Sequence, residues 1–266
     1  MKVKNSSSLT RYGSWFALAV IFSIGCWFLS QWQFSRQAEV TAANQLVNRN
    51  YDAPIVPLET ILQPDEPWDR NLEFRPVAIS GRYIPSSSLL VRNRPYDGQP
   101  GFLQLVAFRT DSGSAIWIER GWYPTGSNQD VPDYVAQLDA REHSLVIRLR
   151  PSEAPDTRQA PTGQLQNIDL VKASSTLGSP TYRQAYGRLV DETPAQSRGV
   201  AFDKPQLSEG NHLSYAMQWI LFALMAIGAV FWNISQDRRR AAGLPPRKLK
   251  ALNRDRDAEI EDEILK

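Results

Sequence analysis

Two long intervals without a charged residue stand near the two ends of the chain. The first lies between Arg11 and Arg36, and the second covers residues 210–236. A membrane-spanning helix needs about 20 predominantly apolar residues, and both intervals are long enough. Tryptophans lie towards the ends of the first interval, where the aromatic anchors of a span are expected. The pattern therefore predicts transmembrane helices over residues 12–35 and 211–235.

Basic residues flank both predicted spans on the same side. Residues 1–11 carry two lysines and one arginine, and three successive arginines occupy positions 238–240. Because Lys and Arg accumulate on the cytoplasmic side, we expect both termini in the cytoplasm and residues 36–210 on the outer side of the cell (inner) membrane. The tail at 236–266 is basic and then acidic. Its composition is typical of a surface helix or a disordered segment.

A cleaved signal peptide is the alternative interpretation of the first apolar interval. Val40-Thr41-Ala42 resembles a small-residue cleavage site. The apolar stretch is longer than the roughly 7–15 residues of a signal-peptide core, however, and this length favours a retained span.

Short strand patterns separated by turn residues fill the region between the spans. Residues 102–108 are apolar on both faces, as in a buried strand, whereas residues 145–150 alternate between apolar and polar. The alternation of residues 72–83 changes parity at Arg75-Pro76, which predicts a bulge or an edge position. Turns as short as Asp111-Ser112-Gly113 predict that the first four strands form an antiparallel meander.

We therefore expect residues 36–210 to form an extracytoplasmic β-rich (α+β) domain. Its architecture should be an antiparallel curled sheet or a partly closed barrel. A short helix is expected within residues 168–177, capped by Asn167. The predicted strands are residues 72–83, 89–94, 102–108, 115–122, 145–150 and 182–190.

The composition excludes several kinds of binding and catalytic site. With one cysteine and two histidines in 266 residues, the chain has no intramolecular disulfide and too few ligands for the usual four-ligand zinc site. A net charge of +2 gives no reason to expect nucleic acid, and glycine-rich phosphate loops are absent. No G-x-S-x-G elbow occurs, and we interpret His143, Asp65-Glu66 and Asp191-Glu192 as surface residues. We therefore expect no enzyme and no catalytic residue.

The polar cluster at the start of the second span is the strongest candidate site. An ionisable side chain at a span is costly, and a neutral imidazole such as that of His212 can hold haem iron as an axial ligand. Tyr215 and Trp219 follow at i+3 and i+7, on the same helix face. The alternative is a belt of aromatic and polar residues without a ligand, which the spacing alone favours. Copper delivery is less well supported, because Cys26 is alone and Met217 lies off this face.

Three arginines of the outer domain are further candidates. Arg92 and Arg94 lie two apart on one predicted strand and face the same side, and Arg120 ends another strand near Trp122. The forked donors of arginine suit carboxylates, including haem propionates. Ordinary strand-end and turn-anchoring arginines are the more common alternative.

Four motifs, in this order along the chain, carry a resemblance to a known family. They are WQFSR at 32–36, RPVAISGRY at 75–83, VRNRPYDGQPG at 91–101 with ERGW at 119–122, and NHLSYA at 211–216 with Trp219. This set resembles the surfeit locus protein 1 (SURF1-like) family of cytochrome c oxidase assembly factors, over all of the chain except the charged tail. Ser30 departs from the family, which usually has glycine there, and Gln37 to Glu39 stand where a lysine is usual.

The resemblance implies a membrane-anchored chaperone of respiratory-chain biogenesis that is not an enzyme. It further implies that haem a is delivered to or inserted into subunit I of the oxidase, with subunit I, the haem a synthesis machinery and the lipid bilayer as partners. His212 is then the haem contact, beside Tyr215 and Trp219. The motif residues Trp32, Gln33, Arg36, Arg92, Arg94, Arg120 and Trp122 become candidates for partner or propionate contacts.

Two other classes of function stay open. An envelope sensor or scaffold would use the outer β domain to bind a ligand or partner protein without haem. A membrane-tethered hydrolase would need a nucleophile that the sequence does not reveal.

Overall fold

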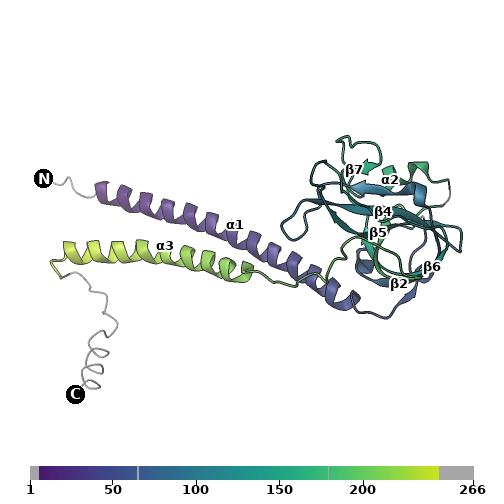
Figure 1. The fold of residues 1–266 in the computed structure, drawn as a ribbon. Coiled ribbons are helices and arrows are strands. Elements are labelled where there is room, and N and C mark those ends of the chain that lie inside the picture. The colour runs from purple at the N-terminus through teal and green to yellow at the C-terminus, as the bar shows by residue number, and fades with distance from the viewer. Residues whose placement is uncertain (1–5, 65, 179, 246–266) are drawn as a thin grey trace, which may run out of the picture. The chain divides into compact units, whose positions relative to one another are not determined.

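The protein is described by a computed structural model that covers residues 6–64, 66–178 and 180–245 (Figure 1). It separates into a helical unit, formed by the chain up to Val40 and from Glu209 onward, and a β-rich unit, Thr41–Ser208. The helices are α1 (Ser6–Asn50), α2 (Leu170–Ala173) and α3 (His212–Ala241), with 3-10 turns at Leu58–Thr60, Arg70–Leu72, Pro85–Ser87 and Ser174–Thr176. The strands are β1 (Val56–Pro57), β2 (Pro76–Tyr83), β3 (Leu89–Val91), β4 (Gly101–Thr110), β5 (Ala115–Pro124), β6 (Glu142–Pro151), β7 (Gln164–Leu165) and β8 (Ala185–Thr193).

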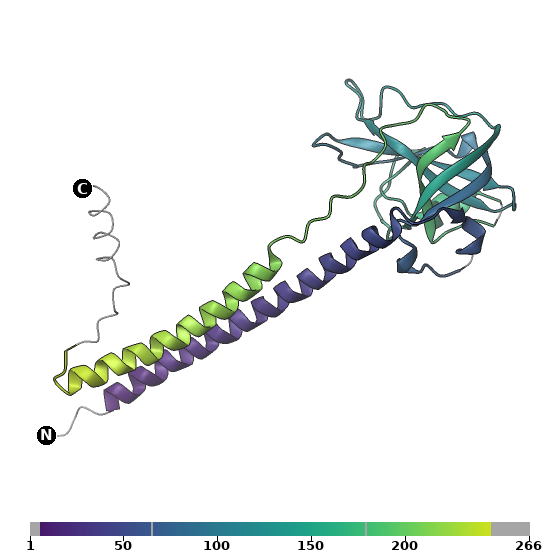
Figure 2. The ribbon, with the colours of Figure 1, turned by 90° about the horizontal axis from the view of Figure 1, so that it is seen from below.

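Helices α1 and α3 lie side by side in the helical unit (Figure 2). Each is long and apolar enough to cross a membrane, by length and composition. Within this unit their buried positions carry mostly small side chains, which allow two helix backbones to approach closely. These positions are Ala19, Cys26, Ser30 and Gln33 on α1, and Ala216 and Val230 on α3.

The prediction of two apolar helices that flank a β-rich domain is confirmed. Helix α1 continues to Asn50, as the helical composition of residues 37–49 indicates. Helix α3 ends at Ala241, so it includes the three arginines at 238–240. Of the remaining predicted tail, residues 242–245 are described and residues 246–266 lie outside the described residues.

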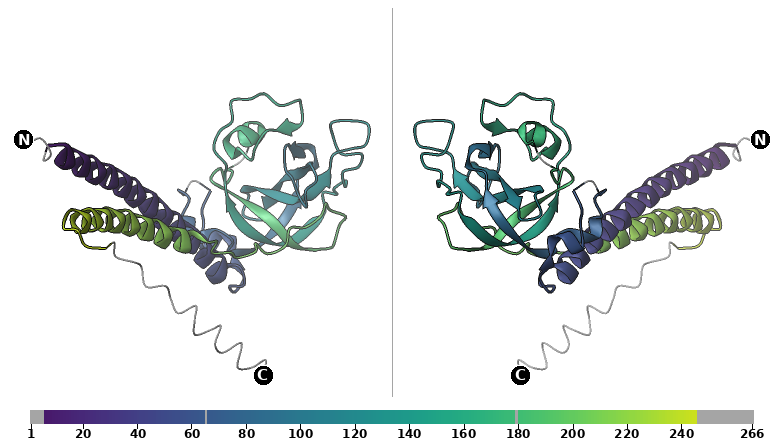
Figure 3. Two further views of the ribbon diagram at one scale, coloured as in Figure 1. Left: turned by 90° about the vertical axis from the view of Figure 1, so that its left-hand side faces the viewer. Right: turned by 90° about the vertical axis from the view of Figure 1, so that its right-hand side faces the viewer.

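Five strands of the β-rich unit close into a barrel (Figure 3). The ring runs β2-β6-β8-β5-β4 and returns to β2, and every pairing is antiparallel except the parallel pair of β5 and β8. The other strands extend the sheet at its edges: β1 beside β2, and β3 between β4 and β7. The predicted four-strand meander is wrong in its first pairing: β3, β4 and β5 are successively antiparallel, as predicted, but β2 pairs with β4 and not with β3.

Gly81 stands where β2 turns from one neighbour to the other and closes the barrel. It is paired with His143 of β6 and with Thr110 of β4. Its φ is 153°, and a Cβ at this position would lie 2.0 Å from the carbonyl oxygen of Arg109. Only glycine allows two backbones to approach so closely.

The strand predicted from residue 72 begins later. Arg70–Leu72 is a 3-10 turn, Phe74 has a φ of 67°, and β2 starts at Pro76. The change of parity at Arg75-Pro76 therefore marks the entry into the strand and not a bulge within it.

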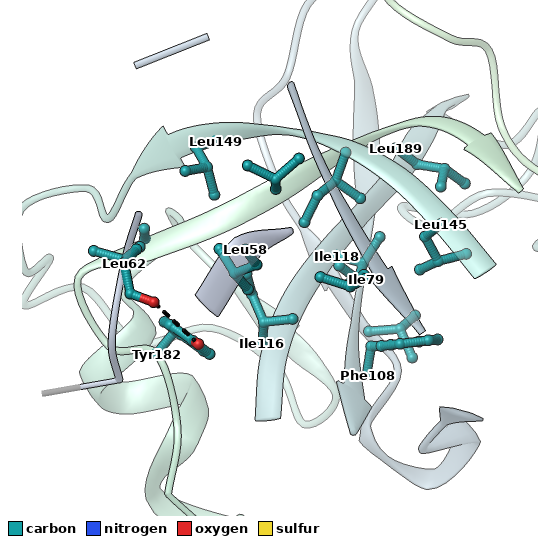
Figure 4. Close-up of a cluster of buried hydrophobic side chains, with 14 of the residues drawn as sticks. Leu58, Leu62, Ile79, Phe108, Ile116, Ile118, Leu145, Leu149, Tyr182 and Leu189 are labelled. Carbon is teal, nitrogen blue, oxygen red and sulfur yellow. Dashed lines mark hydrogen bonds between the residues drawn. The ribbon is translucent and has the colours of Figure 1, made fainter. Parts of the chain in front are cut away.

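Two hydrophobic cores lie on opposite faces of β4 and β5. One fills the barrel, where Tyr182 also donates a hydrogen bond of 3.3 Å to the carbonyl of Leu62 (Figure 4). The other lies under α2, β3 and β7 and includes Trp117, whose indole N–H donates to Ser174 Oγ at 3.0 Å. Alternate residues of β4, such as Leu105 and Val106, belong to different cores, which explains why residues 102–108 are apolar on both faces.

Three local predictions are corrected by the packing. Asp169, not Asn167, caps α2, and its carboxylate accepts from the backbone N–H groups of the first turn. His143 and Glu192, predicted at the surface, are both buried. Asp191 and Glu66 are exposed, as predicted, whereas Asp65 lies outside the described residues.

Candidate functional site

The candidate site lies between α1 and α3, where two polar contacts join the helices. The Nδ1 atom of His212 is 2.9 Å from Oε1 of Gln33, and Ser30 Oγ donates to the carbonyl oxygen of Ala216 at 3.1 Å. Ser30 and Gln33 are three residues apart on α1, and His212 and Ala216 are four apart on α3, so each pair lies on one helix face. The two hydrogen bonds between the helices therefore lie next to each other along the helix pair.

The contact with Gln33 selects which ring nitrogen of a neutral His212 carries the hydrogen. An amide oxygen only accepts, so Nδ1 must donate its hydrogen, and the neutral ring then has its lone pair on Nε2. In the described part of the chain, Nε2 has no hydrogen-bond partner. A ligating histidine commonly has this arrangement, in which one nitrogen is held by an acceptor and the other binds the metal.

Gly210 keeps the space beside the imidazole open. Its φ is 63°, and a Cβ at this position would lie 3.2 Å from Cδ2 and 3.3 Å from Nε2 of His212. A larger residue would therefore be strained and would also crowd the nitrogen that carries the lone pair.

The donor set suits a haem iron better than a free metal ion. No group of three or more His, Cys, Asp and Glu side chains placed to hold a metal occurs among the described residues. Haem iron is already held by four porphyrin nitrogens and is commonly bound by a single proximal histidine. One open imidazole nitrogen at His212 is therefore compatible with axial ligation of a haem iron.

The other predicted residues of the helical unit are either exposed or engaged with neighbours on their own helix. Trp32 and Tyr215 are exposed on their helices, Trp219 packs edge-on against Phe222, and Arg36 forms an exposed ion pair within α1. Among the residues that the structure describes, no hydrogen bond or ring contact joins any of them to His212.

Arg92 and Arg94 of the outer domain are paired with side chains of the domain itself. Arg92 bonds the carboxylate of Asp130 and, at 2.5 Å, the amide oxygen of Gln164. Arg94 bonds both carboxylate oxygens of Glu153, at 2.9 and 2.5 Å. Burial would raise the pKa of the Glu153 carboxyl, but the bonds from Arg94 and from the Ile168 backbone outweigh it, so that pKa is lowered.

Arg120 belongs to a separate network inside the barrel. Its guanidinium is fully buried and bonds Glu192 at 2.7 Å and the hydroxyl of Tyr83 at 3.3 Å. Burial raises the pKa of the Tyr83 hydroxyl well above its ordinary value. Trp122 instead supports the motif loop, because its indole N–H donates to the carbonyl oxygen of Arg94.

The structure thus brings together two pairs of predicted residues, Gln33 with His212, which are 179 positions apart, and Arg94 with Trp122, which are 28 positions apart. Sequence analysis missed the roles of Ser30 and Gly210 beside the first pair. In the sequence, Ser30 is distinguished only by its departure from the family resemblance. The small side chain at this position is the feature that could have indicated close helix packing.

Comparison with known proteins identifies the family. A sequence model of the SURF1 family matches residues 20–224. An uncharacterized SURF1-like protein of Mycobacterium tuberculosis is 29% identical over 87% of this chain and 89% of its own length. A SURF1-like protein of Rickettsia bellii is 25% identical over 82% of this chain and 89% of its own length. The cytochrome oxidase assembly protein SHY1 of Saccharomyces cerevisiae is 28% identical over 52% of this chain and 34% of its own length.

The region matched by the family model extends from α1 to α3. It includes the first contact residue, Ser30, the last, Ala216, and the whole barrel between them. The chain belongs to the SURF1 family.

Proposed function

We propose that this protein is a membrane-anchored assembly factor for cytochrome c oxidase and that it holds haem a through His212 for transfer to subunit I. The assembly role is supported by membership of the SURF1 family and by similarity to a yeast protein named for cytochrome oxidase assembly. The haem role is supported by one observation above all: His212 is oriented by Gln33 and keeps Nε2 open.

Each residue near the helix pair has a defined task in this proposal. Nε2 of His212 would bind the iron, while Gln33 Oε1 accepts from Nδ1–H and would so hold the tautomer and the ring plane. Tyr215 and Trp219 are proposed to contact the porphyrin edge from the same helix. The haem itself supplies the redox-active iron that the oxidase needs, and the chain only binds and orients it.

The arginine candidates have weaker support as propionate ligands. Arg92 and Arg94 would each have to exchange a bond to a carboxylate of the domain for one to haem. Arg120 would have to leave a buried ion pair with Glu192. We therefore place the haem contact of this proposal on the helix pair.

We also propose that the protein lies in the cell membrane with both termini in the cytoplasm. The three arginines at the carboxyl end of α3 support this orientation under the positive-inside rule. A retained first span, and not a cleaved signal peptide, is required, because cleavage near residue 42 would remove Gln33 from His212. Reporter fusions at both ends and in the β-rich unit test the orientation, and an extracytoplasmic carboxyl terminus would contradict it.

The decisive experiment is an absorbance spectrum of the full-length protein purified from cells that make haem a. We expect a haem spectrum in the wild-type protein and its loss in His212→Ala. The matched control is Met217→Leu, which alters α3 away from the face of His212 and should retain haem. Full haem occupancy in His212→Ala would refute the ligand role.

A second measurement separates haem binding from docking on the oxidase. If the protein only docks, His212→Ala should still co-purify with subunit I and support oxidase maturation. If it presents haem, His212→Ala should still bind subunit I while the subunit lacks haem a.

A further inference from the structure

A cluster of arginines covers the outer face of the barrel where β6 and β8 run side by side. Ile147 and Leu149 alternate with Arg148 and Arg150 along β6, and Arg188 lies on β8 directly opposite Arg148. Because Ile147 and Leu149 belong to the core that fills the barrel, the two arginines of β6 point outward. Like charges directly opposite one another on paired strands are destabilising, so Arg148 and Arg188 need compensation.

Aromatic rings hold the three guanidinium groups in place. The Cζ atom of Arg148 lies 3.7 Å from the ring centroid of Tyr51, and that of Arg188 lies 4.4 Å from the ring centroid of Phe202. The Cζ atom of Arg150 lies 4.6 Å from the ring centroid of Phe74 in the same way. These cation–π contacts restrain the guanidinium groups, so their donors have less freedom to reorient.

Carboxylates compensate two of these arginines but not the third. Arg150 pairs with Glu73 at 3.1 Å, and Arg188 pairs with Glu119 at 3.0 Å. Arg148 donates from Nε to the carbonyl oxygen of Tyr51 at 3.2 Å, and within the described residues no carboxylate pairs with it and neither of its terminal nitrogens has a partner. The cluster therefore has one positive charge that is not neutralised by this part of the chain.

A small cavity opens among these side chains. Its volume is about 100 Å³, and it is lined by the three arginines together with Tyr51, Phe74 and Phe202. The Nε atom of Arg150 is buried and has no hydrogen-bond partner among the residues that the structure describes. Since a buried donor without an acceptor costs free energy, this atom also indicates a missing acceptor. The cavity has room for one small polar group and not for a macrocycle.

We propose that this cavity, the Arg148 pocket, binds a phosphate-type oxyanion. Arg148 supplies the forked donors and the unpaired charge, Arg150 and Arg188 supply the surrounding positive field, and the three rings wall the pocket. Planar, forked donors are the usual means by which proteins bind phosphate oxygens. The phosphate belongs either to a free anion or to a lipid headgroup. This site is distinct from His212 and does not depend on haem binding.

The test measures the melting temperature of the full-length protein in phosphatidylcholine nanodiscs. Sodium phosphate is titrated against sodium chloride at equal ionic strength, and the β-rich unit is followed by circular dichroism. For a free anion we expect phosphate to raise the melting temperature by about 3 °C at tenfold excess over the dissociation constant. Arg148→Gln should abolish this rise. The matched control is Arg109→Gln, an exposed strand arginine of the same barrel, which should keep it.

A second arm tests the lipid source. The same proteins are placed in phosphatidylglycerol nanodiscs without added phosphate. A melting temperature that is higher in phosphatidylglycerol than in phosphatidylcholine, and that depends on Arg148, assigns the phosphate to a lipid headgroup. Arg148→Lys keeps the charge but lacks the fork, so it should weaken binding about tenfold and serves if Arg148→Gln does not fold.

The proposal is overturned if neither phosphate nor phosphatidylglycerol stabilises the wild-type protein. It is equally overturned if Arg148→Gln and Arg148→Lys respond as strongly as the wild type. Loss of haem from His212→Ala leaves these outcomes unchanged, so the two proposals fail separately.

Discussion

The two histidines of this protein stand in opposite settings. His143 is buried in the barrel, with Nδ1 3.1 Å from the carbonyl oxygen of Pro194 and Nε2 2.9 Å from Asp139 and 3.0 Å from Gln196. His212 begins α3, and its one side-chain hydrogen bond within the described residues runs from Nδ1 to Gln33. Both nitrogens of His143 are engaged, whereas His212 has one nitrogen left for a ligand. The partners of each ring nitrogen, and not the residue type, separate a structural histidine from a candidate ligand.

The surroundings of the two histidines also differ in how many paired polar groups they contain. Near His143, the buried pair of Arg120 and Glu192 forms a network in which each charged group has a partner. Such a network stabilises the fold only while it is complete, because a buried charge without its partner is costly. The contacts at His212 are few, and their loss should affect binding more than folding.

The largest effect is expected from breaking the barrel network. Glu192→Ala leaves the Arg120 guanidinium buried and unpaired, and we expect the free energy of unfolding to fall by about 3–5 kcal/mol. Chemical denaturation of the full-length protein in detergent measures it. The control is the double variant Arg120→Met/Glu192→Leu, which removes both charges and should recover most of the loss. An equal loss in both variants would contradict the ion-pair explanation.

A medium effect is expected from removing the group that orients His212. Gln33→Leu leaves the imidazole in place but removes the acceptor for Nδ1–H, so haem affinity should fall about 10–100-fold with little change in melting temperature. Haem titration monitored by absorbance measures this. The matched control is Met217→Leu, because Met217 lies on α3 with His212 but off the face of that residue. An unchanged affinity in Gln33→Leu would remove the oriented-histidine argument.

A smaller effect on the melting temperature is expected from lowering the pH. The pKa of Glu153 is lowered in the folded protein, so the stability from its pair with Arg94 is present above the ordinary glutamate pKa, about 4.3, and is lost as pH falls through the lower folded value. The pair is about one-third exposed on the Glu153 side, so its contribution is about 1 kcal/mol or less. Melting temperatures from pH 7 to pH 3 should fall more steeply in the wild type than in Glu153→Gln. Parallel curves would argue against this pair as a source of acid sensitivity.

The smallest effect on stability is expected from removing the hydrogen bond between Ser30 and the Ala216 carbonyl. Ser30→Ala removes the bond to the Ala216 carbonyl but keeps the small side chain that close packing requires. Hydrogen bonds between membrane helices contribute about 0.6 kcal/mol on average, so the melting temperature should fall by no more than about 2 °C. Ser30→Leu is the contrasting variant, because its bulk should separate the helices and weaken haem binding as well. A large fall in the melting temperature of Ser30→Ala would mean that this hydrogen bond, and not the packing, holds the helices together.

The sequence by itself determined the features that depend on local chemistry. Uncharged intervals of sufficient length identified both membrane-spanning candidates, and the alternation at residues 145–150 identified β6. The four motifs identified the SURF1 family, and the position of His212 at the start of a span identified it as a candidate ligand. Each of these features can be recognised in a short window of sequence, because it depends on the preferences of neighbouring residues.

Only the tertiary structure decided which distant residues meet. Pattern alone did not reveal that Gly81 closes the barrel, that Gln33 reaches His212, or that Arg94 pairs with Glu153. The pair Asp191-Glu192 illustrates the reason. Successive residues of a strand face opposite sides, so one carboxylate turns to solvent and the other enters the barrel to meet Arg120. Which of the two turns inward depends on the register of the whole sheet, and that register is a property of the packed fold.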